Sequence, residues 1–420
     1  MRILLIGSGG RESALAWKMA SSSLVTSVMV SPGNSGMKKI SNKISLVNVS
    51  TWESYLEFKV DLVVIGPEAP LMEGLSDFFE KEGIPVVGPS QKAAMLEGSK
   101  AFCKEIFELG NIPTPFYQIA ESVTQAKILL STWKLESVVV KVDALAQGKG
   151  VVVCDTLEKA VEVVDAFFDG SFLGYPVKKI LLEEKIIGPE ASAFALCDGE
   201  NFLYLGSATD YKRLLDQDQG PNTGGMGAIS PSPILTDEDE TWIKENIFAP
   251  TLKVMKERGT LYKGFLFVGL MKTEDGLKAL EFNTRLGDPE TQSLIPRITQ
   301  DLVPLLMAAA TKGLHECSLQ LSKQYALHIV LAAQGYPGTH GQKIRQGDLI
   351  TLDRLNEGNL FFPASVIENE SCLLTNGGRV CGLTVLASQL EEARDVAYQE
   401  ISKIHFTGAH FRRDIGVKFL

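Results

Sequence analysis

Short apolar runs and amphipathic segments alternate along the first 97 residues of the chain. The apolar runs show no polar alternation, and such runs joined by helices are typical of a parallel sheet buried on both faces. The pattern therefore predicts a Rossmann-like α/β domain over residues 1–97. Its strands are expected at residues 3–6, 25–30, 62–65 and 86–87, and its helices at residues 12–20 and 75–82.

The pattern changes from residue 98 onward. A helix over 99–109 and a proline-containing linker over 111–115 precede a compact segment at about 115–180, which is small enough to move as a lid. We expect one domain over residues 98–324 that contains this lid subdomain. Within the lid, helices are expected at 123–133 and 157–168, and strands at 138–142, 151–154 and 180–184. Beyond the lid, antiparallel strands are expected at 191–196, 202–206, 265–271 and 276–282, the last two joined by an Asp-Gly turn.

The last segment, residues 325–420, combines short strands with one helix near 390–404. Turn signals at 336–338 and 376–378 separate the strands. This pattern predicts a small C-terminal α+β domain. The whole chain is therefore expected to be a multidomain protein of mixed α/β and α+β class.

Composition narrows the function classes. The net charge of −10 and the absence of a local basic patch argue against nucleic acid or a membrane surface as a partner. The six cysteines form no CxxC pair, so a zinc site or a disulfide framework is not expected. The N-terminal apolar run ends after four residues and is too short for a signal peptide or a membrane span. We expect a cytoplasmic protein that acts on small molecules.

A possible metal site lies at the end of the last predicted hairpin. Glu281 and Asn283 are two residues apart, so in a strand they share a face about 7 Å apart. Their oxygen atoms suit Mg²⁺, which takes few protein ligands and completes its shell with phosphates and water. Arg285 follows on the same face as a fixed cation for carboxylate or phosphate. The alternative is an edge strand with solvated polar residues.

The first turn of the chain, residues 7–12, resembles a dinucleotide fingerprint but departs from it. Glu12 stands where the third glycine is needed, and the second strand ends in Ser31-Pro32 without the acid that holds a ribose. A glycine turn at a helix N-terminus remains, and such a turn can bind a phosphate group. Loops at 32–34 and 66–68 follow neighbouring strands and are expected to line the same pocket.

Two further segments suggest nucleotide binding. Lys141 and Lys149 lie at either end of a loop of small residues, which is not a Walker A motif because Gly150 and a strand follow Lys149. Lys100, which opens a helix, is a third candidate cation. The apolar strand that ends at Glu183 is followed by a turn whose backbone could meet an adenine edge. Each feature also has an ordinary structural reading, as a glycine-rich turn, a solvated lysine or an edge strand.

In order and spacing, the lysine loop, the acid-ended strand and the Glu281/Asn283 strand resemble the ATP-grasp enzymes. Further segments resemble the phosphoribosylamine–glycine ligases (glycinamide ribonucleotide synthetases), and the match runs from residue 1 to residue 416. The chain departs from that family at Ser13, where histidine is usual, and at Ala144, where glycine is usual. The first departure bears on a contact to the sugar phosphate, and the second should stiffen the loop. The segments that carry this resemblance are residues 9–12, 66–71, 96–100, 220–227 and 281–292.

The resemblance implies a reaction and its ligands. ATP would phosphorylate the carboxylate of glycine, and the amine of 5-phosphoribosylamine would attack the resulting glycyl phosphate. The products would be glycinamide ribonucleotide, ADP and phosphate, as in purine synthesis. The implied cofactor is Mg²⁺ or Mn²⁺, ATP is a co-substrate, and a monomer, or else a dimer, is expected.

The resemblance also implies roles for individual residues. The metal would lie on Glu281 and Asn283. ATP would be bound by Lys100, Lys141, Lys149, Glu183, Glu184 and Glu190, with Glu183 and the following backbone at the adenine and Glu190 at the ribose. Arg285, Lys149 and the backbone of Gly224 and Gly225 would act in catalysis. The substrates would meet Gly9, Gly10, Arg11, Glu12, Asn34, Glu68, Asn222, Thr223, Arg285 and Asp288. For Asp210, Lys212 and Arg213, a ligand role and a salt bridge both remain open.

Three rival classes remain. Another ATP-grasp carboxylate–amine ligase, or a carboxylase, would share the lysine loop and the metal strand but should lack the loop at 220–227. A nicotinamide-dependent oxidoreductase would need the acidic ribose residue that Ser31-Pro32 does not supply. A non-catalytic nucleotide-binding protein would give no reason for Glu281 and Asn283 to occur together.

Overall fold

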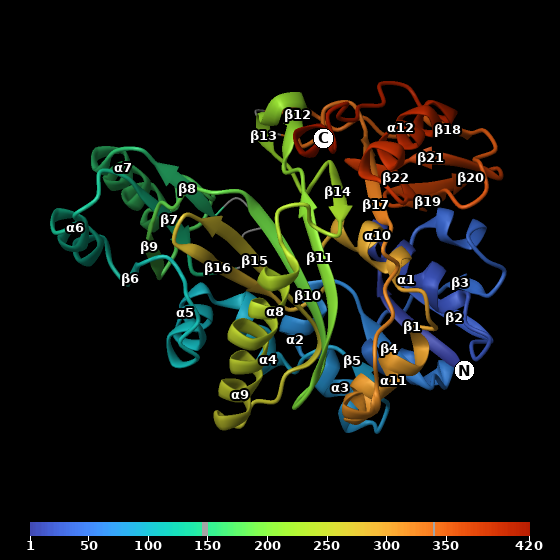
Figure 1. Cartoon of the computed structure of the whole chain (residues 1–420), viewed down its shortest axis with the longest axis horizontal. Coiled ribbons are helices and arrows are strands. Elements are labelled where there is room, and N and C mark those ends of the chain that lie inside the picture. The colour runs from blue at the N-terminus through green and yellow to red at the C-terminus, as the bar shows by residue number, and fades with distance from the viewer. Residues whose placement is uncertain (145–149, 339–340) are drawn as a thin grey trace.

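A computed structural model of the chain describes residues 1–144, 150–338 and 341–420 (Figure 1). The N-terminal domain is the expected Rossmann-like unit, built on a parallel sheet with strand order β3-β2-β1-β4-β5. Its strands are β1 (Arg2–Gly7), β2 (Ser27–Pro32), β3 (Ile44–Leu46), β4 (Leu62–Ile65) and β5 (Val86–Val87), and its helices are α1 (Gly10–Ala20), α2 (Glu68–Glu73) and α3 (Leu75–Lys81).

The carboxyl ends of β1, β2 and β4 lie at one edge of this sheet. β1 is buried on both faces and pairs in parallel with β2 and β4, with Ile3 opposite both Val28 and Leu62. The loops after the strands are joined by backbone hydrogen bonds from Gly33 N to Gly7 O (3.1 Å) and from Gly66 N to Ile6 O (3.0 Å). The three loops therefore converge.

The lid is a separate antiparallel sheet with its own apolar core, with strand order β6-β9-β7-β8. It projects from the rest of the chain at the left of Figure 1. Its first and last strands are neighbours: Tyr117 lies opposite Glu183, and Glu184 N donates to Phe116 O at 2.8 Å. The lid therefore leaves and rejoins the chain at almost one point. Its elements are β6 (Tyr117–Ala120), α6 (Val123–Ser131), β7 (Val138–Val142), β8 (Val151–Cys154), α7 (Leu157–Phe168) and β9 (Ile180–Glu184).

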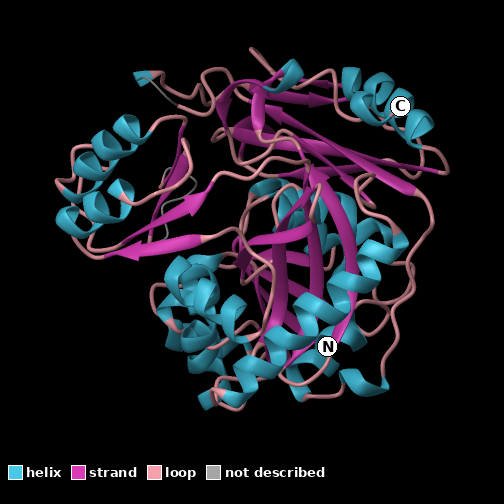
Figure 2. Ribbon diagram, turned by 60° about the vertical axis from the view of Figure 1, so that its left-hand side comes forward, coloured by secondary structure: helices cyan, strands magenta, loops and turns pink. Residues whose placement is uncertain are grey.

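One eight-stranded sheet forms the centre of the molecule, with strand order β16-β15-β10-β11-β14-β17-β22-β19 (Figure 2). It continues across the predicted boundary at 324/325, because β14 pairs with β17 over Gly227–Ser230. The C-terminal segment is thus hydrogen-bonded into the sheet of the middle domain. The strands are β10 (Glu190–Asp198), β11 (Phe202–Asp210), β14 (Gly227–Ser230), β15 (Lys263–Thr273), β16 (Gly276–Asn283), β17 (Tyr325–Ala332), β19 (Leu360–Pro363) and β22 (Arg379–Ala387).

Several remaining elements were not expected from the pattern. The helix expected over 390–404 ends at Glu400, because residue Ile404 instead pairs with Leu352 in a short strand. The expected helix at 99–109 is α5 (Lys100–Leu109), whose N-terminus is capped by Ser99.

Further helices that were not expected are α4 (Gln91–Gly98), α8 (Asp237–Ile243), α9 (Ala249–Glu257), α10 (Glu290–Leu294) and α11 (Val303–Thr311). The C-terminal segment also contains β18 (Leu349–Leu352), β20 (Val366–Asn369), β21 (Cys372–Thr375), α12 (Leu390–Glu400) and β23 (Ile404–His405).

The shared sheet predicts different outcomes for two deletions. Removal of residues 325–420 exposes the edge of β14 and the apolar face that it shares with β17, so the fragment should aggregate or lose cooperative unfolding. Replacement of residues 116–184 by a short glycine–serine linker should leave a folded protein, because the two ends of the lid are adjacent. Size-exclusion chromatography and thermal unfolding check both. A folded, monomeric 1–324 fragment would contradict the role given to the shared sheet.

Candidate active site

A cavity of about 750 Å³ lies where the N-terminal domain, the lid, the central sheet and the C-terminal segment meet. Each part supplies a charged side chain to its wall. Arg11 comes from the N-terminal domain, Lys141 from the lid, Glu281 from β16 and Arg379 from β22. The remaining lining includes apolar side chains of the lid and of the central sheet, namely Val139, Val151, Val153, Phe267, Leu270, Met271 and Leu280.

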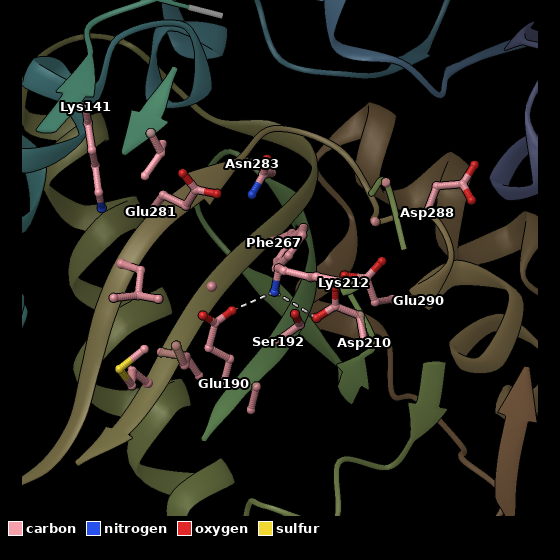
Figure 3. A pocket seen from close by; sticks show the side chains of 18 of the residues that line it. Lys141, Glu190, Ser192, Asp210, Lys212, Phe267, Glu281, Asn283, Asp288 and Glu290 are labelled. Atoms are coloured by element: carbon pink, nitrogen blue, oxygen red, sulfur yellow. Dashed lines mark hydrogen bonds and ion pairs between the residues drawn. The ribbon is translucent and has the colours of Figure 1, made fainter. Parts of the chain in front are cut away.

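The expected metal residues lie together at the end of β16. Figure 3 shows Glu281 and Asn283 entering the same part of the cavity, while Phe282 between them is buried in the core on the other face. Among the described residues no cation pairs with the Glu281 carboxylate. Asn283 Oδ1 accepts one hydrogen bond, from Arg285 Nη2 at 3.2 Å, and keeps a second lone pair.

These two residues fit a hard divalent cation. A free carboxylate and an amide oxygen are the donors that Mg²⁺ and Mn²⁺ prefer. No group of three or more His, Cys, Asp or Glu residues suited to a metal is found in the described parts of the chain. A cation here would therefore need oxygen atoms from a bound phosphate to complete its shell.

Arg285 lies beyond the end of β16, but its side chain lines the same cavity as Glu281 and Asn283. Its guanidinium makes four hydrogen bonds: to Glu68, Glu97, Asn283 and the carbonyl of Leu286. Burial opposes its charge, but the two carboxylates outweigh burial and raise the pKa of Arg285 above its ordinary value. One of its five N–H groups remains for a ligand.

The pKa values of the two carboxylates around Arg285 are shifted in opposite directions. Burial dominates at Glu97 and raises the pKa of its carboxyl, although Arg285 and Thr284 donate to it. At Glu68, burial is outweighed by Arg285, its backbone hydrogen bond and Arg11, and the pKa is lowered. Glu68 was expected to bind substrate, and the structure also gives it the task of holding Arg285. Glu97 was not anticipated as a partner of Arg285.

The N-terminal turn is held by its own glutamate. Glu12 accepts from Gly9 N at 2.7 Å and from Arg11 Nε at 2.5 Å, and only 1% of it is exposed. A side chain on Gly7 would meet Glu12 within 2.5 Å, and Gly7 has a φ of +125°, so this position requires glycine. Glu12 is therefore occupied in capping α1 and does not line the cavity, contrary to its expected contact with substrate.

Asp288 links this turn to the opposite wall. Its carboxylate accepts from Arg11 N at 3.2 Å and lies 3.4 Å from Arg379 Nη2. Burial opposes ionisation, but Arg379 and Arg11 outweigh it and hold the pKa of Asp288 at about 2. Gly9 and Gly10 lie beside Asp288 and Gln292, respectively. Asp288 thus lines the cavity as a fixed negative charge.

Asn34 and Ser13 lie behind the same turn. Asn34 is buried and donates to Ser8 O at 2.8 Å, and its Oδ1 has no partner among the described residues. Ser13 is fully buried and donates to the carbonyl of Pro363 in β19. Ser13, which stands where the family usually has histidine, therefore joins the N-terminal domain to the C-terminal segment. Neither residue lines the cavity.

On the lid side, Lys141 reaches the cavity and pairs with Glu183 at 2.8 Å. Glu183 also pairs with Lys104 at 3.4 Å, a buried lysine that sequence reasoning missed. Glu184 lines the cavity as expected. Lys100 begins α5 but is not among the described residues that line the cavity. Lys149 lies outside the described residues.

A second charged cluster occupies the floor of the cavity. Lys212 Nζ contacts Glu190 at 2.6 Å and Asp210 at 2.9 Å (Figure 3). All three line the cavity, so the salt-bridge reading of Asp210 and Lys212 is confirmed, and a ligand role for them stays a prediction. Glu290 lies nearby, and burial together with Asp210 raises its pKa to about 7. Arg213 instead donates to Gly220 O at 2.7 Å outside this cluster.

The glycine loop at 220–227 is held by the C-terminal segment. Arg379 Nη1 donates to the carbonyls of Gly224 and Asp288, each at 2.6 Å, and Gly224 N donates to Tyr336 Oη at 2.9 Å. Gly225 N donates to Thr223 Oγ1 at 2.9 Å. Both backbone N–H groups expected to meet an acyl phosphate are therefore already used within the chain.

Only some of the other residues predicted in this loop lie at the cavity. Thr223 and Gly224 line the cavity, whereas Asn222 ends the short strand β13 (Gln219–Asn222) and pairs with Arg213 of β12 (Arg213–Leu215). Arg379 and Tyr336 were missed because each acts across more than 90 residues of sequence. The only local signal was a glycine turn, Gly377-Gly378, directly before Arg379.

Comparison with protein families decides the affiliation of the chain. Residues 1–97 match the phosphoribosylglycinamide synthetase N domain, residues 98–291 its ATP-grasp (A) domain, and residues 326–418 its C domain. The chain belongs to the phosphoribosylglycinamide synthetase family. This confirms the resemblance to phosphoribosylamine–glycine ligases, and with it an ATP-dependent ligase that works with a divalent metal ion on small-molecule substrates.

Individual relatives agree with this affiliation. Phosphoribosylamine–glycine ligase of Brucella melitensis is 42% identical over 422 residues, covering 99% of this chain and 97% of the relative. The ligase of Escherichia coli strain K12 is 41% identical over 426 residues, covering 99% and 98%. The crystal structure of the Thermotoga maritima ligase superposes with a TM-score of 0.86 at 33% identity, covering 99% of this chain and 100% of that one.

A more distant structure shows the fold alone. The biotin carboxylase domain of Hydrogenobacter thermophilus 2-oxoglutarate carboxylase, solved with MgADP and bicarbonate, has a TM-score of 0.75 at 19% identity and covers 97% of this chain and 91% of that one. Among the described residues, no helix is both long and apolar enough to cross a membrane. The cytoplasmic location and the oligomeric state stay predictions.

Glu290 gives the site a testable pH dependence. Its folded pKa of about 7 lies above the ordinary value of 4.5, so the folded state binds the extra proton between these values. Its contribution to the free energy of unfolding is then full at low pH and is lost as pH rises through about 7. Glu290→Gln cannot ionise and should gain in thermal stability relative to wild type between pH 5 and pH 8. An equal difference in Tm at both pH values would contradict the raised pKa.

Proposed function

We propose that this cavity joins glycine to 5-phosphoribosylamine at the expense of ATP, giving glycinamide ribonucleotide, ADP and phosphate through glycyl phosphate. The observation that carries the proposal is the placement of Glu281 and Asn283 between two groups of charges. Lys141 lies on the lid side, and Arg11, Asp288 and Arg379 lie on the other. A phosphate donor and a small amino acid can therefore meet at β16.

ATP would lie between the lid and the central sheet. Val139, Val153 and Leu280 supply apolar walls for the adenine ring, with the backbone after Glu183 at its polar edge. Glu190 would meet the ribose hydroxyls, and Lys141 the phosphates. Mg²⁺, or Mn²⁺ in its place, would be held by Glu281 and Asn283 and would neutralise phosphate charge as the transfer proceeds.

Glycine would lie beside the loop at 220–227. The structure supports the side chains of Arg285 and Arg379, more than the loop backbone, as the groups that stabilise the acyl phosphate, because the N–H groups of Gly224 and Gly225 already have acceptors. Asp288 stays ionised at neutral pH and is a suitable partner for the ammonium group of glycine.

The sugar phosphate would lie at the N-terminus of α1, beside Gly9, Gly10 and Arg11. The helix dipole and the charge of Arg11 favour an anion there, while the N–H groups of Gly9 and Arg11 already donate to Glu12 and Asp288. Arg11 lines the cavity next to Asp288, so the amine of 5-phosphoribosylamine would be directed at the glycine site. All of these groups come from one chain, which supports a monomer as the active unit.

The reaction is tested by measuring ADP release with ATP and Mg²⁺. Glycine and freshly prepared phosphoribosylamine are added singly and together, and rapid release is expected only with both. Alanine or serine should replace glycine poorly, because the loop at 220–227 beside the proposed substrate site holds four glycines and leaves space only for a small acid. Faster ADP release with bicarbonate than with glycine would favour the carboxylase alternative instead.

The metal assignment is tested by Glu281→Ala. Removal of the charged ligand should lower turnover by at least roughly 10²-fold, as for other lost charge-stabilising groups, and should weaken Mn²⁺ binding in the presence of ADP, followed by electron paramagnetic resonance. Glu274→Ala is a matched control, because Glu274 lies in the exposed turn of the same hairpin. Equal Mn²⁺ affinity in both variants would remove Glu281 from the metal site.

A further inference from the structure

A buried lysine, Lys104 of α5, lies behind the ion pair of Lys141 and Glu183. Its Nζ is 3.4 Å from Glu183 Oε2, the same oxygen that Lys141 Nζ contacts at 2.8 Å. The side chains of Lys104 and Glu183 are each 2% exposed, whereas that of Lys141 is 12% exposed and reaches the cavity. Lys104 does not line the cavity, so it can influence a bound nucleotide only through its neighbours.

Lys104 is held firmly in this position. It donates to Thr114 Oγ1, and Thr114 in turn donates to the carbonyl of Ala279 in β16 at 2.8 Å. The ammonium group also lies 5.6 Å from the centroid of the Phe107 ring and 5.5 Å from that of Tyr117. Two aromatic faces and a hydroxyl oxygen favour a cation at this point. Burial lowers the pKa of Lys104, and the nearby Glu183 carboxylate opposes this shift and favours the charged form.

The sheet of the lid sets the geometry of Glu183. Lys141 on β7 lies opposite Leu181 on β9, so Glu183, two residues further along, shares its face and is its diagonal neighbour. Tyr117 on β6 lies directly opposite Glu183 on the other side. The Glu183 carboxylate is thus enclosed between strands, with one cation on the cavity side and one on the side of α5. Two positive charges share a single negative charge.

We propose that Lys104 is a positioning residue that neutralises Glu183 and so leaves the ammonium group of Lys141 available to a phosphate of ATP. The inference rests on the phosphate-binding role proposed for Lys141. With both lysines protonated, the three groups carry a net charge of about +1. Without Lys104, the Lys141–Glu183 pair is neutral. Lys141 could then reach a phosphate only by leaving a buried carboxylate unpaired, which is costly.

The test compares the affinities of the full-length protein for MgATP and for adenosine, by isothermal titration calorimetry. Lys104→Met should weaken MgATP binding about tenfold, equivalent to one charged hydrogen bond, and leave adenosine binding unchanged. Lys104→Arg keeps the charge and should restore most of the loss. Lys18→Met is the matched control, because Lys18 is equally a buried lysine but is bound to the carbonyl of Ile298, in the packing of α1.

A second comparison removes the carboxylate that Lys104 is proposed to neutralise. The double variant Lys104→Met/Glu183→Gln should have the wild-type ratio of MgATP to adenosine affinity, because Lys141 then keeps its charge with no carboxylate beside it. This ratio can be measured even if Lys104→Met alone does not fold, since the double variant leaves no buried charge unpaired. A lower ratio in the double variant would overturn the proposal.

Other outcomes also separate the possibilities. If Lys104→Met lowers the affinities for MgATP and adenosine equally, Lys104 only supports the local fold and the inference is overturned. The inference is also overturned if neither affinity changes. Lys141→Met tests the underlying assignment: if it leaves the ratio unchanged, the proposed role of Lys141 fails. If Lys141→Met lowers the ratio and Lys104→Met does not, the inference about Lys104 alone is wrong.

Discussion

The guanidinium group of Arg285 joins three distant parts of the chain at the centre of the cavity. It donates to Glu68 at the start of α2, to Glu97 in α4 and to Asn283 at the end of β16. Such a buried network adds little net stability, but loss of one partner leaves an unpaired buried charge and costs about 3–5 kcal/mol. Its main effect is therefore geometric. The N-terminal domain must dock against β16 for Arg285 to be satisfied, and this docking also orients the amide oxygen of Asn283.

Charged side chains are also held between partners of opposite charge in the rest of the cavity. Asp288 lies between Arg11 and Arg379, Lys212 lies between Asp210 and Glu190, and Glu183 lies between Lys104 and Lys141. Groups held in advance at their working positions need little reorganisation when charge develops on a substrate. Glu281 differs, since no cation pairs with it in the described parts of the chain. An unpaired carboxylate on the cavity wall is the position that a divalent cation would complete.

Local patterns predicted those features whose causes are local. The spacing of Glu281 and Asn283 placed them on one strand face, and the bounds of β7, β8, α7 and β9 matched because apolar runs and caps set them. Features that depend on distant contacts could not be foreseen. The pairing of β14 with β17 joins two predicted domains, and Arg379 reaches the loop at 220–227 from a segment with no catalytic motif. The capping of α1 by Glu12 was not foreseen from the sequence.

The glycine loop explains why the C-terminal segment belongs to the site. Residues 223–226 have no regular partner strand, yet their polar backbone groups must be satisfied. Tyr336, Thr223 and Arg379 satisfy some of them, and the carbonyls of Lys212 and Tyr211 accept from the N–H groups of Thr223 and Met226, so the loop N–H groups are used within the chain. In the proposed reaction, stabilisation of the acyl phosphate would fall to side chains such as Arg285 and Arg379, which come from different domains. A site built in this way forms only when the domains are docked; the continuous sheet holds the central domain and the C-terminal segment together, and the Arg285 network joins the N-terminal domain to β16.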